Sequence, residues 1–308
     1  MKGLMGVKKL IYVLILILIF FFTFSYRENI LSYATKNYEN LFFTPSKLEK
    51  NEYTRSYNFK YVQNTDTFIP NNKQDILNIF YTVVNSGMDE FSFYCKSEYE
   101  NCLNDVNDII KNQNIVSNIN NFVHPYNTCK DFKTDVYKYG KITIKSNKLY
   151  DSYMIDNVNF EIEKIINENI NDKMTDKEKI KTIHDYIINH TKYDQDRSDK
   201  KIIKYKSDTA FGALKEGYAL CGGYADSMML FLERFGIKNY KIASENHVWN
   251  YVFLDNEWYH LDLTWDDPVN KEGKDILDYS YFLITDKDLE KLDKSYHTYD
   301  KTVYLQLN

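Results

Sequence analysis

The sequence predicts an α+β protein in which a helix packs on an antiparallel sheet, and three observations carry that prediction. Apolar residues recur at helical spacing over residues 221–235, and Gly236 follows where a glycine commonly ends a helix. Two strand-like runs come next, at 247–254 and 257–263, and the two residues between them are typical of a hairpin turn. Mixed helix and strand patterns occupy residues 45–150, which therefore predict a small α/β or α+β unit ahead of this core.

The N-terminus predicts a membrane anchor. Residues 10–24 are almost entirely apolar, and three lysines precede them. Such a run is either the apolar part of a secretory signal peptide or a short anchor. The small residues at 32–34 suit signal cleavage but lie far from the apolar run, so we expect an uncleaved single-pass anchor in the cell membrane with an extracytoplasmic body. The alternative is secretion after cleavage, with a mature chain that begins near Thr35.

Four regions divide the chain on this interpretation. They are a cytoplasmic tip and signal anchor at 1–27, a juxtamembrane segment at 28–44, the small domain at 45–150 and a larger domain at 151–308. The patterns in the small domain predict helices at 73–85 and 97–111, strands at 57–62 and 90–95, and one or two strands at 136–150. A helix pattern at 155–169 opens the larger domain. The small domain carries no catalytic motif, so scaffolding or substrate presentation is its expected role.

Charge and cysteine content narrow the function classes. The net charge is -5, and the lysines are interleaved with acids, so we expect no nucleic-acid partner. If Cys221 is free, an odd number of cysteines remains: Cys95, Cys102 and Cys129. In an oxidising exterior the simplest disulfide joins Cys95 to Cys102, although the sequence leaves the connectivity open.

Cys221 lies in the first turn of the predicted helix. Unpaired backbone N–H groups and a positive partial charge at a helix N-terminus favour a thiolate and can donate to an oxyanion. Gly222 and Gly223 would let a substrate backbone approach closely. A buried core cysteine is the alternative, because free cysteines are among the most buried residues.

The hairpin favours the catalytic interpretation. If Leu254 pairs with Glu257, then His247 and Asp262 share a face as diagonal neighbours, about 7 to 8 Å apart at the backbone. A base that takes a thiol proton needs a carboxylate on its other ring nitrogen to hold its tautomer. The sequence therefore predicts Cys221 as nucleophile, His247 as base and Asp262 as orienting acid.

Two further residues are cleft candidates. Tyr218 is close enough to the cysteine in sequence to be a second oxyanion donor, and a packed loop tyrosine is the alternative. Trp249 falls on the same hairpin face as His247 and Asp262, so we expect it to line the cleft.

Six motifs between about Asp176 and Thr298 carry a resemblance to a known family. They are Ile183-His184-Asp185-Tyr186-Ile187, Thr191-Lys192-Tyr193-Asp194, Ala213-Leu214 followed by Cys221-Gly222-Gly223-Tyr224-Ala225, Phe235-Gly236-Ile237, His247-Val248-Trp249-Asn250, and the run from Trp258 to Pro268. Together they resemble the bacterial transglutaminase-like superfamily, whose core is similar to the papain-like cysteine-protease fold. That family orders its nucleophile, base and acid as Cys, His and Asp, which maps onto Cys221, His247 and Asp262.

The resemblance implies a reaction type and leaves its outcome open. Family members form a thioester between the cysteine and an acyl group, then pass it to an amine or to water. It therefore implies an extracytoplasmic acyltransferase or cysteine peptidase acting on a protein or peptide substrate at the cell surface, by crosslinking, deamidation or proteolysis. The alternative is a catalytically idle surface-binding or structural envelope module with the same fold.

We expect neither a metal nor another cofactor. His184 lies on the apolar face of a helix that a capping box opens at Thr175, which predicts a hydrogen-bonded core histidine. Asp266 and Asp267 precede Pro268, a combination typical of a turn. The sequence contains no calcium-loop pattern and no zinc-ligand spacing.

Overall fold

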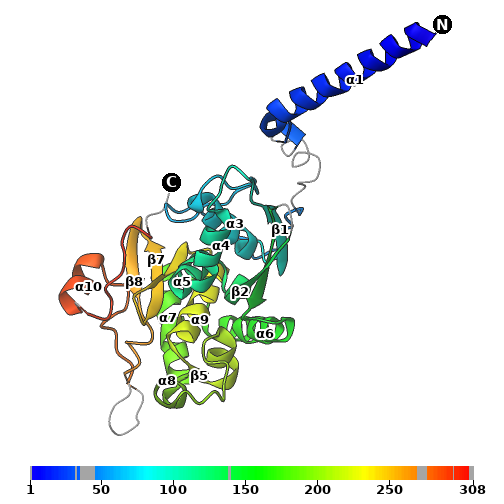
Figure 1. Cartoon of the computed structure of the whole chain (residues 1–308). Coiled ribbons are helices and arrows are strands. Elements are labelled where there is room, and N and C mark those ends of the chain that lie inside the picture. Colours follow the sequence, from blue (N-terminus) through cyan, green and yellow to red (C-terminus); the bar gives the residue numbers. More distant parts are fainter. Residues whose placement is uncertain are drawn as a thin grey trace.

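The computed structural model describes residues 2–31, 33–34, 46–137, 140–268, 276–293 and 295–304. It is a mixed helix-and-sheet structure, with two three-stranded antiparallel sheets and one short parallel pair among the described residues (Figure 1). The elements of the N-terminal part are α1 (Lys2–Ser25), α3 (Lys73–Asn85), β1 (Glu90–Tyr94), α4 (Cys102–Lys111), α5 (Gln113–Phe122), η1 (Pro125–Asn127), β2 (Cys129–Val136) and β3 (Lys141–Lys148). Those that follow are α6 (Ser152–Asn169), α7 (Asp176–His190), β4 (Lys192–Tyr193), α8 (Gln195–Lys200), η3 (Gly212–Glu216), β5 (Tyr218–Ala219), α9 (Cys221–Arg234), β6 (Asn239–Ala243), β7 (Val248–Leu254), β8 (Glu257–Leu261) and α10 (Asp286–Leu292).

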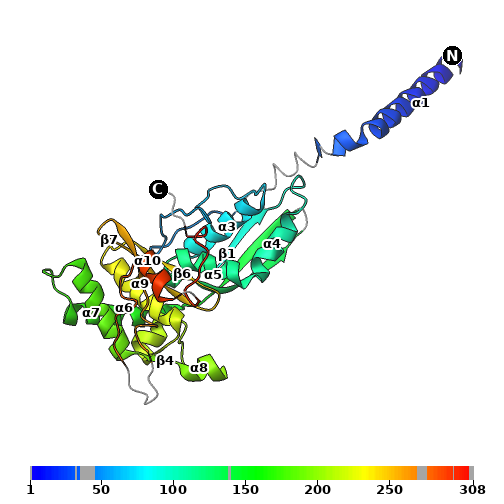
Figure 2. The same cartoon turned by 90° about the vertical axis from the view of Figure 1, so that its left-hand side faces the viewer.

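The N-terminal helix α1 extends away from the rest of the chain, and its side chains from residue 11 onward are exposed (Figures 1 and 2). The predicted single-pass membrane anchor is wrong, because none of the helices in the described ranges is long and apolar enough to cross a membrane. The apolar run at 10–24 is shorter than the roughly 20 residues that a crossing helix needs. Ser32, Thr35 and most of the segment at 28–44 lie outside the described residues.

The first sheet has the strand order β1-β3-β2, with α3, α4 and α5 packed beside it. The helix predicted at 73–85 and the strand predicted from residue 90 are confirmed, because each has a strong local pattern. The strand predicted at 57–62 is wrong: this stretch is a loop in which the Phe59 amide donates to the Val62 carbonyl. Phe59 and Val62 are nevertheless fully buried, so the apolar pattern reports burial rather than a strand.

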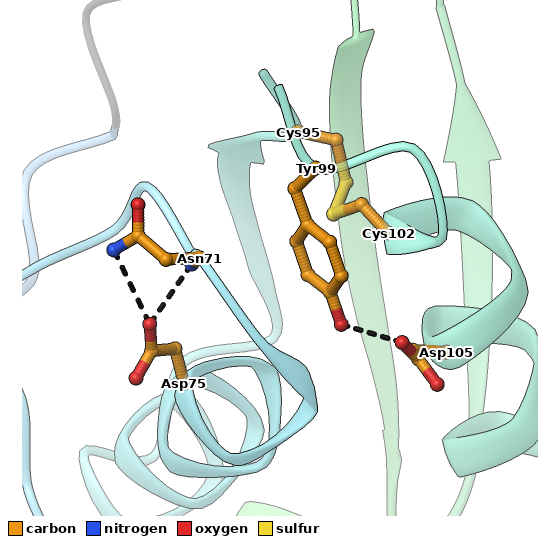
Figure 3. The surroundings of a disulfide bond; sticks show 6 residues. All are labelled: Asn71, Asp75, Cys95, Tyr99, Cys102 and Asp105. Carbon is orange, nitrogen blue, oxygen red and sulfur yellow. Dashed lines mark hydrogen bonds between the residues drawn. A yellow bond between two sulfur atoms is a disulfide. The ribbon is translucent and has the colours of Figure 1, made fainter. Parts of the chain in front are cut away.

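A disulfide joins Cys95 and Cys102 and so connects the end of β1 to the first residue of α4 (Figure 3). The pairing expected as the simplest one is confirmed. Beside it, the Tyr99 hydroxyl donates to Asp105 in the first turn of α4 at 2.5 Å. Cys129 is free and buried, and burial raises the pKa of its thiol to about 12.

The second sheet, with strand order β6-β7-β8, contains the predicted hairpin. Leu254 pairs with Glu257, as predicted, and the ladder ends at the pair Asn250 and Leu261. The two turn residues have positive φ angles, 51° at Asp255 and 66° at Asn256. These angles suit the tight turn that matches strand twist, so the turn chemistry fixes the register.

This hairpin sheet separates two hydrophobic cores. Trp249 and Tyr251 point toward the core that contains the N-terminal helices, whereas Val252 belongs to the core built by α6, α7 and α9. Alternation along a strand explains why neighbouring residues enter different cores. On the first face, the rings of Phe59 and Tyr240 pack edge-on with centroids 5.2 Å apart. The N-terminal part of the chain therefore supports the sheet that carries the candidate site.

Candidate active site

Cys221 is the first residue of α9 and is half-buried. The preceding residue, Leu220, caps the helix without a side-chain hydrogen bond, and its carbonyl accepts from the amides of Gly223 and Tyr224. In the described ranges, no backbone carbonyl accepts from the amides of Cys221 and Gly222. The helix N-terminus thus presents free N–H donors beside the thiol, as an oxyanion site requires.

The glycines after the cysteine serve the chain's own packing. A Cβ on Gly223 would lie 2.4 Å from the Ser207 carbonyl oxygen, and one on Gly222 would lie 3.1 Å from that of Asp208. The Leu220 amide also donates to the Ser207 carbonyl at 2.8 Å. We expected Gly222 and Gly223 to let a substrate backbone approach closely. Instead, the loop at 207–209 occupies this side of the helix and fixes where α9 begins.

His247 lies just before β7 and bonds to Asp262, which follows β8. The distance from His247 Nε2 to Asp262 Oδ2 is 2.5 Å, and Asp262 is 1% exposed. The other oxygen, Oδ1, accepts from the amides of Thr264 and Trp265 at 3.0 and 3.3 Å. Both residues therefore share one face of the hairpin, and the carboxylate is held by its own turn.

The protonation of this pair is strongly perturbed. Burial alone would lower the pKa of His247, but the Asp262 carboxylate and the nearby Cys221 side chain raise it to about 10. Burial alone would raise the pKa of Asp262, but His247 and a second histidine, His297, hold it well below its usual range. Near neutral pH the imidazole is therefore a cation that lies between the Asp262 carboxylate and the cysteine.

Sequence reasoning missed His297. Its Nε2 lies 2.8 Å from Asp262 Oδ2, the same oxygen that His247 contacts, and its Nδ1 lies 2.7 Å from Asp293 Oδ2. The one local indication in the sequence is the four-residue separation of Asp293 and His297, which suits the contact between those two side chains. Nothing in the sequence pattern indicates that this segment folds back to the hairpin.

Trp249 packs against the ring of His247. It is 1% exposed, its ring stacks on His247 at 5.6 Å between centroids, and its indole N–H donates to His260 Nδ1 at 2.9 Å. The expectation that it lines the cleft therefore needs correction, because the strand turns this side chain into the core beneath the site. Tyr218 stacks face to face on Tyr205 at 4.1 Å, which matches the packed-loop alternative.

A cavity of about 330 Å³ opens beside the thiol. Its lining includes Cys221, Leu220 and Asn246 from one side and Tyr193, Arg197 and Lys201 from the other. Arg197 is paired with Asp208, whereas Lys201 donates to the Ser198 carbonyl at 2.8 Å. The Cys221 thiol is thus reachable from a cleft with a polar and partly basic wall.

Residues 164–263 match the family model of the transglutaminase-like superfamily. This stretch contains Cys221, His247 and Asp262 in the order nucleophile, base and acid that the resemblance implies. These residues are a transglutaminase-like domain. A search of the curated proteins found no match.

Two solved structures are similar to the chain that contains this transglutaminase-like domain. One is a crystal structure of a TGase, 16% identical, which covers 55% of this chain and 50% of its own length with a TM-score of 0.35. The other is a candidate cysteine protease from Cytophaga hutchinsonii, 14% identical, which covers 43% of this chain and 61% of its own length with a TM-score of 0.27. This chain therefore spans less than two thirds of the length of either structure.

One group of residues in the described ranges has the spacing of metal ligands. His247, Asp262 and His297 offer ligand atoms within 4.8 Å of one another. Both imidazole Nε2 atoms, however, face a single carboxylate oxygen at hydrogen-bond distance. A metal ion would have to displace both protons, so the donor set fits a hydrogen-bonded chain better than a metal centre.

The remaining sequence candidates are structural. His184 is fully buried, with Nε2 3.1 Å from Asp266 and Nδ1 3.0 Å from Asp185, as expected for a core histidine. The capping box predicted at Thr175 is present. Asp266 also accepts from the Tyr281 amide, and Asp267 accepts from the Tyr224 hydroxyl, so both acids tie down the turn after β8.

Proposed function

We propose that this domain catalyses cysteine-dependent acyl transfer on protein or peptide amides, through a thioester on Cys221. One observation carries the proposal: His247 bonds to the buried Asp262 through Nε2, and its pKa is raised to about 10 by that carboxylate and by Cys221. A thiolate–imidazolium pair requires a histidine between a carboxylate and a thiol, whereas a histidine that only packs in the core does not.

The first half of the reaction uses groups that are already in place. The Cys221 sulfur attacks the amide carbonyl carbon, and the new C–S bond places negative charge on the oxygen near the Cys221 amide N–H. His247 then gives its proton to the nitrogen, the C–N bond breaks, and the amine or ammonia leaves. The product is a thioester and a neutral imidazole.

The second half regenerates the enzyme. Neutral His247 takes a proton from an incoming water or amine, which attacks the thioester carbon and displaces the Cys221 sulfur as a thiolate. Asp262 stabilises the imidazolium that forms and holds its orientation. Water gives hydrolysis or deamidation, and an amine gives a crosslink.

The Cys95–Cys102 disulfide supports an extracytoplasmic site of action. Such bonds persist in oxidising surroundings and are rare in the cytosol of most cells. The disulfide lies in the N-terminal part of the chain, and Cys221 is a free cysteine.

The test combines turnover with thiol labelling. The full chain, Cys221→Ala and Cys221→Ser are incubated with a glutamine-containing peptide and a primary amine, and mass spectrometry follows amine gain, ammonia loss and cleavage. We expect turnover in the natural chain only, because a hydroxyl is far less acidic than a thiol. Comparable turnover in Cys221→Ala would remove the mechanism.

Labelling with iodoacetamide below neutral pH separates an enzyme from an idle module. A thiolate paired with His247 labels quickly, whereas Cys129 serves as an internal control because burial raises its pKa to about 12. A Cys221 that labels no faster than an unfolded cysteine would favour the catalytically idle alternative.

A further inference from the structure

His297 is a fully buried histidine whose two ring nitrogens each meet a carboxylate. Nε2 lies 2.8 Å from Asp262 Oδ2 and Nδ1 lies 2.7 Å from Asp293 Oδ2. Burial would raise the pKa of Asp293, but backbone amides and His297 lower it to about 2, and the pKa of Asp262 is also lowered. Both acids are therefore ionised near neutral pH. An ionised carboxylate only accepts hydrogen bonds, so each ring nitrogen of His297 faces an acceptor.

Imidazoles and carboxylates consequently alternate along one chain of contacts. The order is Cys221, His247, Asp262, His297 and Asp293. All four hydrogen-bonding positions on Asp262 are occupied, because Oδ2 serves both histidines and Oδ1 serves two backbone amides. A carboxylate held in this way cannot rotate away from His247.

The ring of His297 is also locked by packing. Tyr281 stacks on it with centroids 4.9 Å apart, Trp249 approaches at 4.8 Å and Trp265 at 5.1 Å. The His247 ring lies 5.2 Å away, nearly perpendicular. His297 is thus held in one orientation, beside both Asp262 and His247.

Other charged groups reach His297 from the side of α10. A cavity of about 380 Å³ there is lined by His297 together with His260, Asp286, Glu290, Asp293 and Lys301. Lys301 pairs with Glu290 at 2.6 Å, and His260 pairs with Asp286 at 2.7 Å. These groups are engaged with one another, so Asp262 and Asp293 are the direct partners of His297.

We propose that His297 is a positioning residue for the reaction, which holds the Asp262 carboxylate in place and shares its Oδ2 atom with His247. The proposal rests on the proposed function for its effect on turnover. His297 lies beyond residues 164–263, so the C-terminal segment adds this contact to the matched domain. A carboxylate oxygen shared by two imidazoles interacts less strongly with each of them, while a fixed carboxylate keeps the catalytic imidazole correctly oriented.

The test compares four variants of the full chain, of which Asp293→Asn is described below. His297→Phe keeps an aromatic ring but removes both donors, His297→Gln keeps a neutral donor, and His190→Gln is the control, since His190 bonds to the Leu214 carbonyl away from the site. NMR of the imidazole nitrogens follows the titration of His247, and turnover is measured across pH. Thermal unfolding checks that each variant folds.

With the His297 imidazole removed, Asp262 Oδ2 interacts more strongly with His247, so the titration of His247 should move upward by about one pH unit in both His297 variants. Turnover should fall about tenfold or more in His297→Phe, because Asp262 loses one of its four hydrogen bonds and is held less firmly, and should recover partly in His297→Gln. Asp293→Asn provides a second route: it removes the carboxylate that holds His297 Nδ1 and should shift the His247 titration in the same direction by less. His190→Gln should change neither measurement.

The proposal and the proposed function fail separately. The proposal is overturned if the His247 titration stays in place in folded His297→Gln and in Asp293→Asn, whatever the turnover. If the His247 titration shifts in a protein that turns over no amide, the effect of His297 on the pair of Asp262 and His247 stands, and the proposed enzymatic function is overturned.

Discussion

Two histidines of the β7–β8 hairpin region each bond an aspartate through Nε2, yet their protonation differs. His247 meets the buried Asp262 at 2.5 Å, and its pKa is raised to about 10. His260 meets Asp286 at 2.7 Å, but burial outweighs this carboxylate and lowers its pKa below the ordinary value. A carboxylate within hydrogen-bond distance is therefore insufficient to make a histidine a cation.

The second ring nitrogen accounts for the difference. His260 Nδ1 accepts the indole N–H of Trp249, and an indole can only donate, so this nitrogen carries no proton. The Asp286 side chain is also 47% exposed, and water weakens its field. The second ring nitrogen of His247 instead interacts with the Cys221 thiol, and the Asp262 carboxylate is shielded from water. Two features therefore separate a catalytic candidate from a packing histidine. One is how deeply its aspartate partner is buried, and the other is which group contacts its second ring nitrogen.

Exchange of each histidine for glutamine should give the largest contrast. We expect His247→Gln to lower turnover by about 10⁵-fold or more, because neither the thiolate pair nor the proton donor survives. His260→Gln should stay within about tenfold of the natural turnover but lose about 1 to 3 kcal/mol of unfolding free energy, because the buried Trp249 N–H loses a well-placed acceptor. Peptide turnover and urea unfolding measure the two effects, and equal loss of turnover in both variants would contradict the comparison.

The two aspartates should differ in the same direction. Asp262→Asn should lower turnover by about 10³- to 10⁴-fold while the protein stays folded, since an amide cannot stabilise the imidazolium as a carboxylate does. Asp286→Asn, the matched control on α10, should change turnover by less than about tenfold because His260 is already neutral. Steady-state kinetics with circular dichroism decides. If Asp262→Asn keeps its natural rate, the orienting acid must be sought elsewhere.

Much of this site follows from local sequence features. A two-residue turn with Asp255 and Asn256 fixes the pairing of Leu254 with Glu257, and the pairing alone places His247 and Asp262 on one face. The start of α9 at Cys221 follows from helical spacing and the glycine at its end. These features depend on neighbours within about 15 residues, which is why a pattern can predict them.

Contacts made by distant segments were beyond the same reasoning. The bond from His297 to Asp262 joins residues 35 apart in sequence, and it depends on how the chain returns after α10. The strand β2 was missed because its apolar residues, Cys129, Phe132 and Val136, do not alternate at the two-residue spacing of a strand. The sequence likewise does not predict the close packing of the 207–209 loop on Gly223, since a glycine alone does not indicate which backbone approaches it.

The pH dependence of turnover should reflect His247 rather than an ordinary histidine. The active pair exists between two apparent pKa values, so turnover should rise and fall as a bell. Because the pKa of His247 is raised to about 10, the alkaline side should fall only as pH approaches that value. The same shift stabilises the fold fully below pH about 6.5, and this contribution is lost as pH rises through 10. A profile that collapses near pH 7 would contradict the raised pKa.

The smallest expected effect tests what keeps His260 neutral. Trp249→Phe retains an aromatic ring but removes the N–H that occupies His260 Nδ1, and it should lower the unfolding free energy at pH 8 by about 1 kcal/mol. The pKa of His260 in the natural fold is lowered, so the unfolded chain binds the extra proton and stability declines as pH falls below about 6.5. Once Nδ1 is free to take a proton beside Asp286, that pKa should rise and the decline should flatten.

Urea unfolding at pH 5 and pH 8, with imidazole NMR of His260, measures both parts of this prediction. Trp258→Phe is the matched control, because it removes the same indole group from a ring that stacks on Tyr251 at 5.0 Å in the same hairpin. The control should leave the pH dependence of stability unchanged. If His260 titrates at the same pH in Trp249→Phe as in the natural chain, burial alone keeps it neutral, and the difference between the two histidines then lies in their carboxylates.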